Sequence, residues 1–463
     1  MHLDFICDQI LRNEFLKKYF TPVPGMVDGV IGLEDGDEGK GKNIDALAPH
    51  YDIVARWQGG PNAGHTIIIG KEKHILRITP SGACHPNCLL FLGNKVLINP
   101  IVLKGEAQLL KQKGIDILGK NNIHTKGRLF VSEIARLILP THIAMDKMSE
   151  ERRGKDKIGS TLNGITPAAV SDLGREGIRV GDLLKRGVKE KIMETMRTHI
   201  ELMQLQKYDI SEEAMSDEIR IWFEALDVIT PEMIVSKYWI NDQLKKGKTV
   251  LAEGAQAWGL DIDYTDAYPN ATSSNTGSGS IYVGLGIPPG SIRRVYGVIK
   301  AYATKVGSGP LPTELNGIIA EDLCKKGNEY GSVTGRQRRV GWLELPKLKQ
   351  AIEINGVTHV FMNKIDVLNK MPFCVATTIK EESAGKSREE FTFDSFNYES
   401  FENTEISVTN PDSEEETVVT SINDEALAFL RFIDEWLQKN TKAHLSMVGV
   451  GPDRKHFILS RQT

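Results

Sequence analysis

The stretch Gly36-Asp37-Glu38-Gly39-Lys40-Gly41-Lys42 indicates how this chain folds. It follows the apolar run 30–33, which predicts a buried strand, and precedes the segment 43–48, which predicts the start of a helix. Glycines permit positive φ and close approach, so successive backbone N–H groups and the helix N-terminus can surround phosphate oxygens. The sequence therefore predicts an anion site between the first strand and the first helix.

The glycine-rich loop departs from an ordinary phosphate-binding P-loop in two ways. Its spacing, Gly36-x4-Gly41-Lys42, fits that motif, but Asn43 stands where the motif needs Ser or Thr for magnesium. Asp37 and Glu38 also place carboxylates inside the loop, and these would repel a phosphate unless a divalent cation lies between them or one acts as a base. Taken alone, the cluster is equally typical of a solvated turn.

Length and composition limit the class of protein. The chain has 463 residues and a net charge of −4, which gives no reason to expect nucleic acid or a membrane surface as a partner. No stretch approaches the ~20 apolar residues of a membrane-spanning helix. The five cysteines are few and scattered, which favours a reducing cytoplasm and free thiols. Cys84-His85-x2-Cys88 resembles half a zinc site, but no second pair follows.

Apolar runs alternate with helical segments, which predicts an α/β fold with a large mixed, mainly parallel central sheet flanked by helices and a P-loop-like nucleotide-binding core. The expected strands are 30–33, 53–56, 66–69, 88–92, 95–98, 249–252, 295–302 and 359–362. Residues 1–24 are expected to be an N-terminal extension with a short amphipathic helix that includes Phe5 and Ile6, and residues 25–463 are expected to form one domain. Polar residues 380–420 predict a surface excursion.

A second glycine-rich segment follows the loop about twenty residues on. It reads Gln58-Gly59-Gly60-Pro61-Asn62-Ala63-Gly64-His65-Thr66. The two segments at this spacing resemble the N-terminal active site of adenylosuccinate synthetases, and the resemblance covers roughly residues 25–463. Enzymes of that family join L-aspartate to C6 of IMP, using GTP and magnesium, and release GDP and phosphate.

The resemblance implies a catalytic role for particular residues. Asp37 would remove the N1 proton of IMP, so that the C6 oxygen can attack the γ-phosphate of GTP. His65 would stabilise or protonate the β–γ bridging oxygen of the leaving GDP, and Lys40 would neutralise phosphate charge. Mg²⁺, one ion per subunit, would be held by Asp37 and the Gly64 carbonyl. Gln256 completes the implied catalytic group.

The turn Asn363-Lys364-Ile365-Asp366 follows an apolar strand and matches the guanine-reading pattern of GTP-binding proteins. The Asp366 carboxylate would accept hydrogen bonds from N1–H and the N2 amino group of guanine, which adenine cannot supply. The implied GTP contacts are Gly36, Glu38, Gly39, Lys40, Gly41, Lys42, Gly64, His65, Thr66, Arg338, Lys364, Ile365, Asp366, Gly449, Val450 and Gly451.

A basic loop at 331–339 resembles the family's aspartate-binding loop, because the fixed fork of arginine suits the capture of carboxylates. Its implied aspartate contacts are Val333, Thr334, Gly335, Arg336 and Arg338. The implied IMP contacts are Asp37, Asn62, Ala63, Gly64, His65, Thr161, Arg175, Gln256, Thr272 and Arg336. In the family Arg175 reaches across a dimer interface, so a homodimer is expected.

The chain departs from the family pattern at several positions. The family usually has Gly-Arg at 162–163 and Lys at 172, where this chain has Leu162-Asn163 and Asp172, so two positive charges near the substrates are lost. Glu34-Asp35 replaces the usual Gln-Trp, and Pro61 replaces His. The leading hypothesis is aspartate–IMP ligation. The alternatives are a paralogue that joins aspartate to another purine nucleotide, such as GMP or dGMP, and a GTP-binding switch or scaffold without ligase chemistry.

Overall fold

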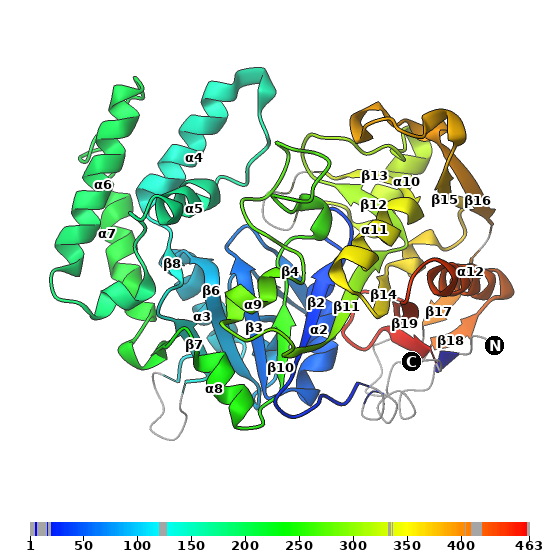
Figure 1. Cartoon of the computed structure of the whole chain (residues 1–463), viewed down its shortest axis with the longest axis horizontal. Coiled ribbons are helices and arrows are strands. Elements are labelled where there is room, and N and C mark those ends of the chain that lie inside the picture. The colour runs from blue at the N-terminus through cyan, green and yellow to red at the C-terminus, as the bar shows by residue number, and fades with distance from the viewer. Residues whose placement is uncertain are drawn as a thin grey trace.

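The fold is built around one large sheet, seen in the computed structural model of Figure 1. The structure describes residues 5–6, 16, 20–119, 127–331, 335, 337–402, 404–408 and 419–460, with the backbone alone for 5–6, 406–408 and 419–421. Figure 1 shows α4 to α7 gathered at one end of the molecule and β15, β16 and α12 at the other. No helix in these ranges is both long and apolar enough to cross a membrane.

The central sheet has 12 strands in the order β1-β20-β19-β14-β11-β2-β10-β3-β6-β7-β9, with β8 paired to β6. All pairs are parallel except β1–β20 and β19–β20. This confirms the predicted mixed, mainly parallel sheet. The strands are β1 Phe5–Ile6, β2 Val27–Gly32, β3 Ile53–Gly59, β6 Leu89–Ile98, β7 Leu129–Ser132, β8 Arg136–Leu137, β9 Ile234–Val235, β10 Val250–Glu253, β11 Ile292–Lys300, β14 His359–Asn363, β19 His444–Gly449 and β20 Phe457–Ser460.

Burial explains why these segments are strands. Every residue of β2, β3, β10 and β14 is buried, as expected for parallel strands that are covered on both faces. Parallel strands present their carboxyl ends at one edge, and ligands of α/β proteins bind there. Each predicted site segment follows the carboxyl end of a parallel strand, so the topology brings these segments to one edge of the sheet. They begin at residues 33, 60, 254, 364 and 450.

The helices follow local capping signals. Asn99 caps α3 by accepting hydrogen bonds from the N–H groups of Ile101 and Val102, and Asn423 caps α12 through Ala426 N–H. The buried Trp222 of α7 donates its indole N–H to the Ile138 carbonyl, so this aromatic side chain belongs to the core. The helices are α2 Lys40–Leu47, α3 Pro100–Gln112, α4 Pro140–Arg153, α5 Ile165–Leu173, α6 Val188–Leu205, α7 Ser216–Ala225, α8 Trp239–Lys245, α9 Ser280–Leu285, α10 Gly317–Gly327, α11 Leu345–Asn355 and α12 Asp424–Asn440.

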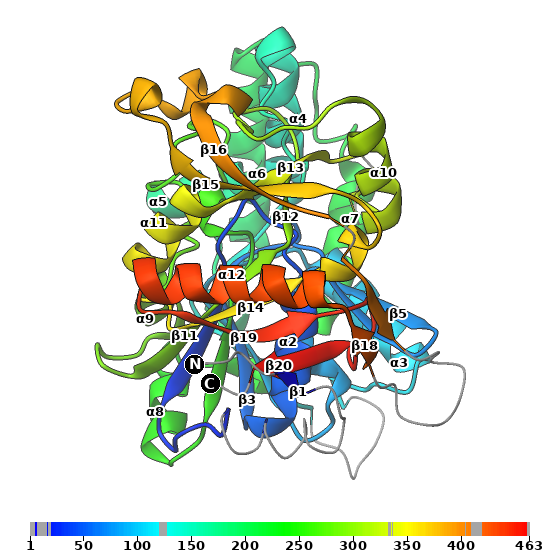
Figure 2. The same cartoon turned by 90° about the vertical axis from the view of Figure 1, so that its right-hand side faces the viewer.

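Three smaller sheets flank the main one, as Figure 2 shows for the four-stranded sheet above α12. That sheet has the order β12-β13-β15-β16, with β12 Tyr302–Lys305, β13 Arg339–Glu344, β15 Phe373–Ile379 and β16 Phe396–Phe401. The two-stranded pairs are β4 His65–Ile69 with β5 Glu72–Leu76, and β17 Ile406–Val408 with β18 Val419–Ile422. The predicted surface excursion at 380–420 therefore contributes β16 to a sheet.

The structure corrects three expected elements. The expected strand 295–302 is divided, because β11 ends at Lys300 and Tyr302 begins β12 in the four-stranded sheet. The runs 88–92 and 95–98 form one strand, because Gly93 lacks a side chain where a Cβ would lie 2.7 Å from the Arg56 carbonyl oxygen and 2.5 Å from that of Gly284. Phe5 and Ile6 form β1 rather than part of a helix, because they pair with the otherwise open edge of β20. The rest of that expected helix lies mostly outside the described residues.

Candidate active site

The phosphate loop turns sharply between β2 and α2. The φ angles of Gly36, Asp37 and Gly39 are 99°, 61° and 86°, in the left-handed region that favours glycine. The Glu38 side chain is buried, and its carboxylate accepts hydrogen bonds from Gly36 N (2.9 Å) and Lys40 Nζ (2.5 Å). The Glu38 charge is therefore neutralised inside the loop, so the repulsion of phosphate expected from the sequence falls on Asp37 alone.

The first turn of α2 is bound to the loops after β14 and β19. Lys42 Nζ donates to the carbonyl oxygens of Gly451 (2.5 Å) and His456 (2.7 Å). Asn363 Nδ2 donates to the Asn43 side chain and to the Glu38 carbonyl, both at 2.7 Å. Asn43, which stands where a P-loop has Ser or Thr, thus joins the phosphate loop to the turn predicted to read guanine.

The loop that contains Gly449, Val450 and Gly451 lies against that turn. A Cβ at Gly449 would be 2.4 Å from Asn363 Oδ1, so the close approach requires glycine. Ile365 is buried, and burial raises the pKa of Asp366, with Lys42 opposing. The structure therefore brings together the two segments predicted to hold guanine.

His65 begins β4 beside the phosphate loop, where a Cβ on Gly41 would be 2.8 Å from the His65 Cβ. Its Nδ1 lies 2.5 Å from Glu253 Oε1, and Glu253 also accepts from Ser81 N (2.7 Å) and Ser81 Oγ (2.9 Å). Burial lowers the pKa of His65, while the hydrogen bond to Glu253 opposes this shift. A neutral ring with Nδ1–H directed at Glu253 leaves Nε2 for a ligand.

A chain of charges connects Asp37 to Lys364. Arg338 Nε lies 2.7 Å from Asp37 Oδ2, and its Nη1 donates to Glu329 Oε2 at 2.6 Å. The buried Glu329 also accepts from Tyr302 Oη and Lys364 Nζ, both at 2.5 Å. Burial alone would raise the pKa of Glu329, but the surrounding cations lower it to about 2. Glu329 is thus an anion that joins Arg338, which contacts the predicted base Asp37, to Lys364 of the turn predicted to read guanine.

The predicted IMP contacts gather at the ends of β3 and β10. Asn62 Nδ2 lies 3.5 Å from Thr272 Oγ1, while Ala63 is buried and Gly64 and Thr66 are half-buried. Gln256 has a φ of 56°, and neither polar atom of its buried amide has a hydrogen-bond partner among the described residues. Because buried amides are normally paired, this unpartnered group fits contact with a ligand.

The other expected nucleotide contacts lie on either side of α5. Thr161 and Arg175 are exposed, and the Arg175 backbone has a φ of 67°. Thr166 Oγ1 lies 2.5 Å from Ser273 Oγ, which brings this segment to the turn that contains Thr272. In the expected aspartate loop, Gly335 is exposed, whereas Val333, Thr334 and Arg336 lie outside the described residues.

Comparison with known proteins decides the family. A family model described as adenylosuccinate synthetase matches residues 29–458. The chain belongs to the adenylosuccinate synthetase family. The adenylosuccinate synthetase of Flavobacterium psychrophilum is 42% identical over 439 residues, which cover 93% of this chain and 99% of the relative. That of Cytophaga hutchinsonii is 46% identical over 344 residues, which cover 74% and 78%.

Solved structures agree with this family. Fully ligated adenylosuccinate synthetase from Plasmodium falciparum matches with a TM-score of 0.78 at 31% identity, over 94% of this chain and 99% of that one. The succinoaminodeoxyadenylate synthetase of cyanophage S-2L, bound to dGMP and dATP, matches with a TM-score of 0.57 at 18% identity, over 93% and 94%. The second likeness shows a shared fold alone.

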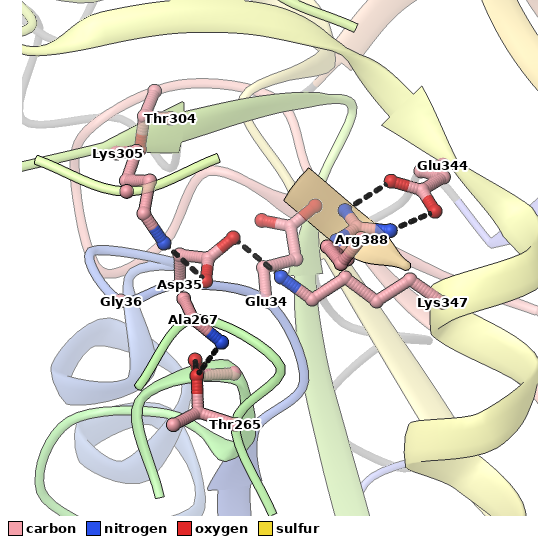
Figure 3. Close-up of polar contacts among 12 residues, drawn as sticks. Glu34, Asp35, Gly36, Thr265, Ala267, Thr304, Lys305, Glu344, Lys347 and Arg388 are labelled. Atoms are coloured by element: carbon pink, nitrogen blue, oxygen red, sulfur yellow. Dashed lines mark hydrogen bonds and ion pairs between the residues drawn. The ribbon is translucent and has the colours of Figure 1, made fainter. Parts of the chain in front are cut away.

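Two departures from the adenylosuccinate synthetase pattern lie directly before the phosphate loop. Figure 3 shows Lys305 and Lys347 reaching the Asp35 carboxylate from two sides, at 3.0 and 2.5 Å. Burial alone would raise the pKa of Asp35, but these lysines lower it. Glu34 lies beside them, and its Oε1 is buried without a partner among the described residues. The Asp35 charge is compensated by two ion pairs, whereas the Glu34 carboxyl group forms no ion pair among the described residues.

Asn163 and Asp172, which also depart from the family pattern, have different hydrogen-bond partners. Asp172 accepts hydrogen bonds from Arg136 and Arg179, so this carboxylate serves as the partner of two arginines. Asn163 Oδ1 accepts from Arg77 Nη2 at 2.7 Å, and Asn163 Nδ2 donates to the Thr161 carbonyl at 3.1 Å. A different arginine, Arg77, thus contacts Asn163, which stands at the position where the family usually has arginine.

The sequence did not single out two residues that position the site. Glu253 orients His65, and the only local signal was its place at the end of an apolar strand. Glu329 holds Arg338 and Lys364, and it lies two residues before the glycine that opens the predicted aspartate loop. Neither contact has a sequence pattern of its own, because each depends on which elements the fold places together.

Proposed function

We propose that this chain joins L-aspartate to IMP at the expense of GTP, giving adenylosuccinate, GDP and phosphate, with its active site at the carboxyl edge of the central sheet. The observation that carries this proposal is the position of the phosphate loop. The loop contacts the turn at 363–366, where Asn363 donates to the Glu38 carbonyl, and its Gly41 packs against His65 in the segment that also contains Asn62. The Asp37 side chain is exposed on this loop. This arrangement of the loop suits a GTP molecule whose guanine lies at the turn 363–366 and whose γ-phosphate faces IMP.

The first chemical step is phosphoryl transfer to IMP. The Asp37 carboxylate takes the N1 proton, so that the C6 oxygen gains electron density and attacks the γ-phosphorus of GTP. The O6–P bond forms, and the bond from phosphorus to the β–γ bridging oxygen breaks. His65 Nε2 lies free to hydrogen-bond the departing oxygen, and Lys40 offsets charge on the phosphates.

The second step replaces phosphate by aspartate. The α-amino nitrogen of aspartate attacks C6, the C6–O bond breaks, and phosphate leaves with the former O6. The Gln256 amide, which has no protein partner among the described residues, would bind the nucleotide during both steps. Arg338 and the adjoining loop would hold the aspartate carboxylates.

The residues present fit a magnesium ion. Magnesium takes one or two carboxylates from the protein and completes its shell with phosphate oxygens and water. Asp37 is an exposed carboxylate beside the phosphate loop, and the Gly64 carbonyl lies in the segment that leads to His65. When bound, the ion would neutralise charge that develops on the transferred phosphoryl group.

The proposed active unit is a homodimer. Arg175 is exposed on the surface, although the resemblance assigns it a contact with the nucleotide phosphate. An arginine from a second copy can therefore complete each site, as closed twofold dimers allow. The few scattered cysteines favour the cytoplasm as the compartment, and the described ones, Cys84, Cys88, Cys324 and Cys374, are free thiols.

The other hypotheses are less favoured. A ligase for GMP or dGMP would suit the fold of the cyanophage enzyme, but that likeness is 18% identical, whereas relatives of the leading family reach 42% over nearly the whole chain. A binding-only switch has no use for the Glu253–His65 pair or for Arg338 beside Asp37.

The Asp37→Ala variant tests the proposed base. We expect turnover with IMP, aspartate and GTP to fall by about 100- to 10,000-fold, the range that general bases contribute. Asp217→Ala on the exposed face of α7 serves as the control and should turn over normally. Initial rates of GDP release measure the effect, and unchanged GDP release by the Asp37 variant would remove this residue from the mechanism.

A further inference from the structure

This chain has Asn163 at the position where the family usually has an arginine. The guanidinium of another arginine, Arg77, lies beside Asn163. Arg77 follows β5, and its Nη2 donates to Asn163 Oδ1 at 2.7 Å. Its Nε donates to the Pro61 carbonyl at 2.8 Å. Both of these partners stand at positions where this chain departs from the family pattern.

These contacts place Arg77 between two groups of expected nucleotide contacts. Pro61 directly precedes Asn62, whose amide lies 3.5 Å from Thr272 Oγ1. Asn163 donates to the carbonyl of Thr161, which is expected to contact the nucleotide phosphate. One guanidinium therefore binds both segments that carry these expected nucleotide contacts.

The backbone at Arg77 is held firmly. The N–H groups of Arg77, Ile78 and Thr79 donate to the Glu106 carboxylate at 2.7 to 3.3 Å. The Arg77 carbonyl accepts from Arg56 Nη1 at 2.5 Å. A side chain on such a fixed segment loses little freedom when a ligand binds, which favours a binding role.

In the described ranges the Arg77 guanidinium forms no ion pair, although the Glu106 carboxylate, which accepts from the Arg77 N–H, attracts its positive charge. The acceptors of its side-chain hydrogen bonds are a carbonyl and an amide oxygen, which are neutral. Burial lowers the pKa of Arg77, but arginine remains charged in proteins. Arg136 and Arg179, in contrast, share the Asp172 carboxylate. Arg77 is thus a half-buried cation that an anionic ligand would complete.

We propose that Arg77 binds the 5′-phosphate of IMP and so restores one of the positive charges near the substrates that this chain lacks at position 163. This inference rests on the IMP site proposed above. The ligand is an oxyanion, for which the carboxylates of aspartate are a second possible source. The phosphate is favoured because the two acceptors of the Arg77 side chain, Pro61 and Asn163, lie next to residues expected to contact the nucleotide.

The test combines Arg77→Gln with a second change that restores the family residue, Asn163→Arg. Arg77→Gln should raise KM for IMP by about 10- to 100-fold, the value of a charge-assisted hydrogen bond, with a much smaller change in kcat. KM for aspartate and GTP should stay near their original values. Adding Asn163→Arg to this variant should recover most of the affinity for IMP, and thermal unfolding shows whether each variant folds.

Calorimetric titration with IMP and with inosine separates the phosphate from the rest of the nucleotide. Arg77→Gln should weaken IMP binding and leave inosine binding unchanged. Arg179→Gln, which removes an exposed arginine from the neighbouring segment, serves as the charge-matched control. Equal losses for IMP and inosine, an unchanged KM for IMP, or a rise confined to KM for aspartate would each overturn the proposal.

The unsubstituted protein provides the reference that separates this inference from the proposed function. If it binds IMP more tightly than inosine, a phosphate site exists, and the variants decide whether Arg77 belongs to it. If the unsubstituted protein binds IMP and inosine equally, the proposed IMP site is wrong, and the proposed role of Arg77 is wrong as well.

Discussion

Burial raises the pKa of Glu34 to about 8, although the nearby Lys300 opposes this shift. One carboxylate oxygen accepts from Lys300 N at 3.3 Å, whereas Oε1 has no partner among the described residues. A folded-state pKa above the ordinary value of 4.5 means that the folded protein retains a proton that the unfolded chain releases. Glu34 therefore contributes stability below pH 4.5 that is lost as the pH rises towards 8.

The direction of this pKa shift gives a prediction for Glu34→Gln. This variant also restores the residue that the family usually has at position 34. The unsubstituted protein should lose about 3 kcal/mol from this group between pH 5 and pH 8, and the variant should not. Urea unfolding at both pH values measures the difference. Parallel pH dependence in the two proteins would mean that Glu34 is ionised in the folded state.

At the scale of the element, the phosphate loop depends on the absence of a side chain at Gly32, the last residue of β2. A Cβ there would lie 2.4 Å from Glu38 Oε2 and 2.7 Å from Lys40 Nζ. These atoms form the buried ion pair that neutralises Glu38 inside the loop. The end of the strand and the loop charges are therefore one structural unit.

Gly32→Ala should displace this pair and leave a phosphate-repelling carboxylate in the loop. We expect the Kd for GTP to rise at least about 10-fold, since a buried charge that loses its partner costs several kcal/mol. Gly105→Ala in α3 is the matched control, because its Cβ would meet nothing within 4 Å and it should bind GTP normally. Equal GTP affinities in the two variants would contradict this account of the loop.

The loop 36–42 and the turn 363–366 could be predicted because each is a continuous pattern at the end of an apolar strand. The Glu253–His65 contact could not, since its members are 188 positions apart and meet only through the pairing of β10 with β3. The sequence placed the Glu38 carboxylate inside the loop but did not give its direction, which is towards the buried Lys40. Side-chain direction inside a glycine-rich turn depends on backbone angles that the residue order leaves open.

At the scale of the whole molecule, the dimer proposal predicts complementation between inactive variants. Asp37→Ala removes the base, and Arg175→Ala removes the residue that would cross to the partner's site. When equal amounts are mixed and allowed to exchange subunits, half of the dimers are hybrids with one intact site, so about a quarter of the normal activity should appear. Activity no higher than the sum of the separate variants would place Arg175 in its own subunit's site or outside the mechanism.

The most direct measurement of the central claim is a product analysis with parallel nucleotides. The purified protein is mixed with GTP, Mg²⁺ and L-aspartate, and IMP, GMP or dGMP is offered separately, with nucleotide products identified by mass. The account predicts an aspartate adduct from IMP alone, with one GDP released per adduct. An adduct formed only from a guanylate, or tight GTP binding with no adduct at all, would contradict it.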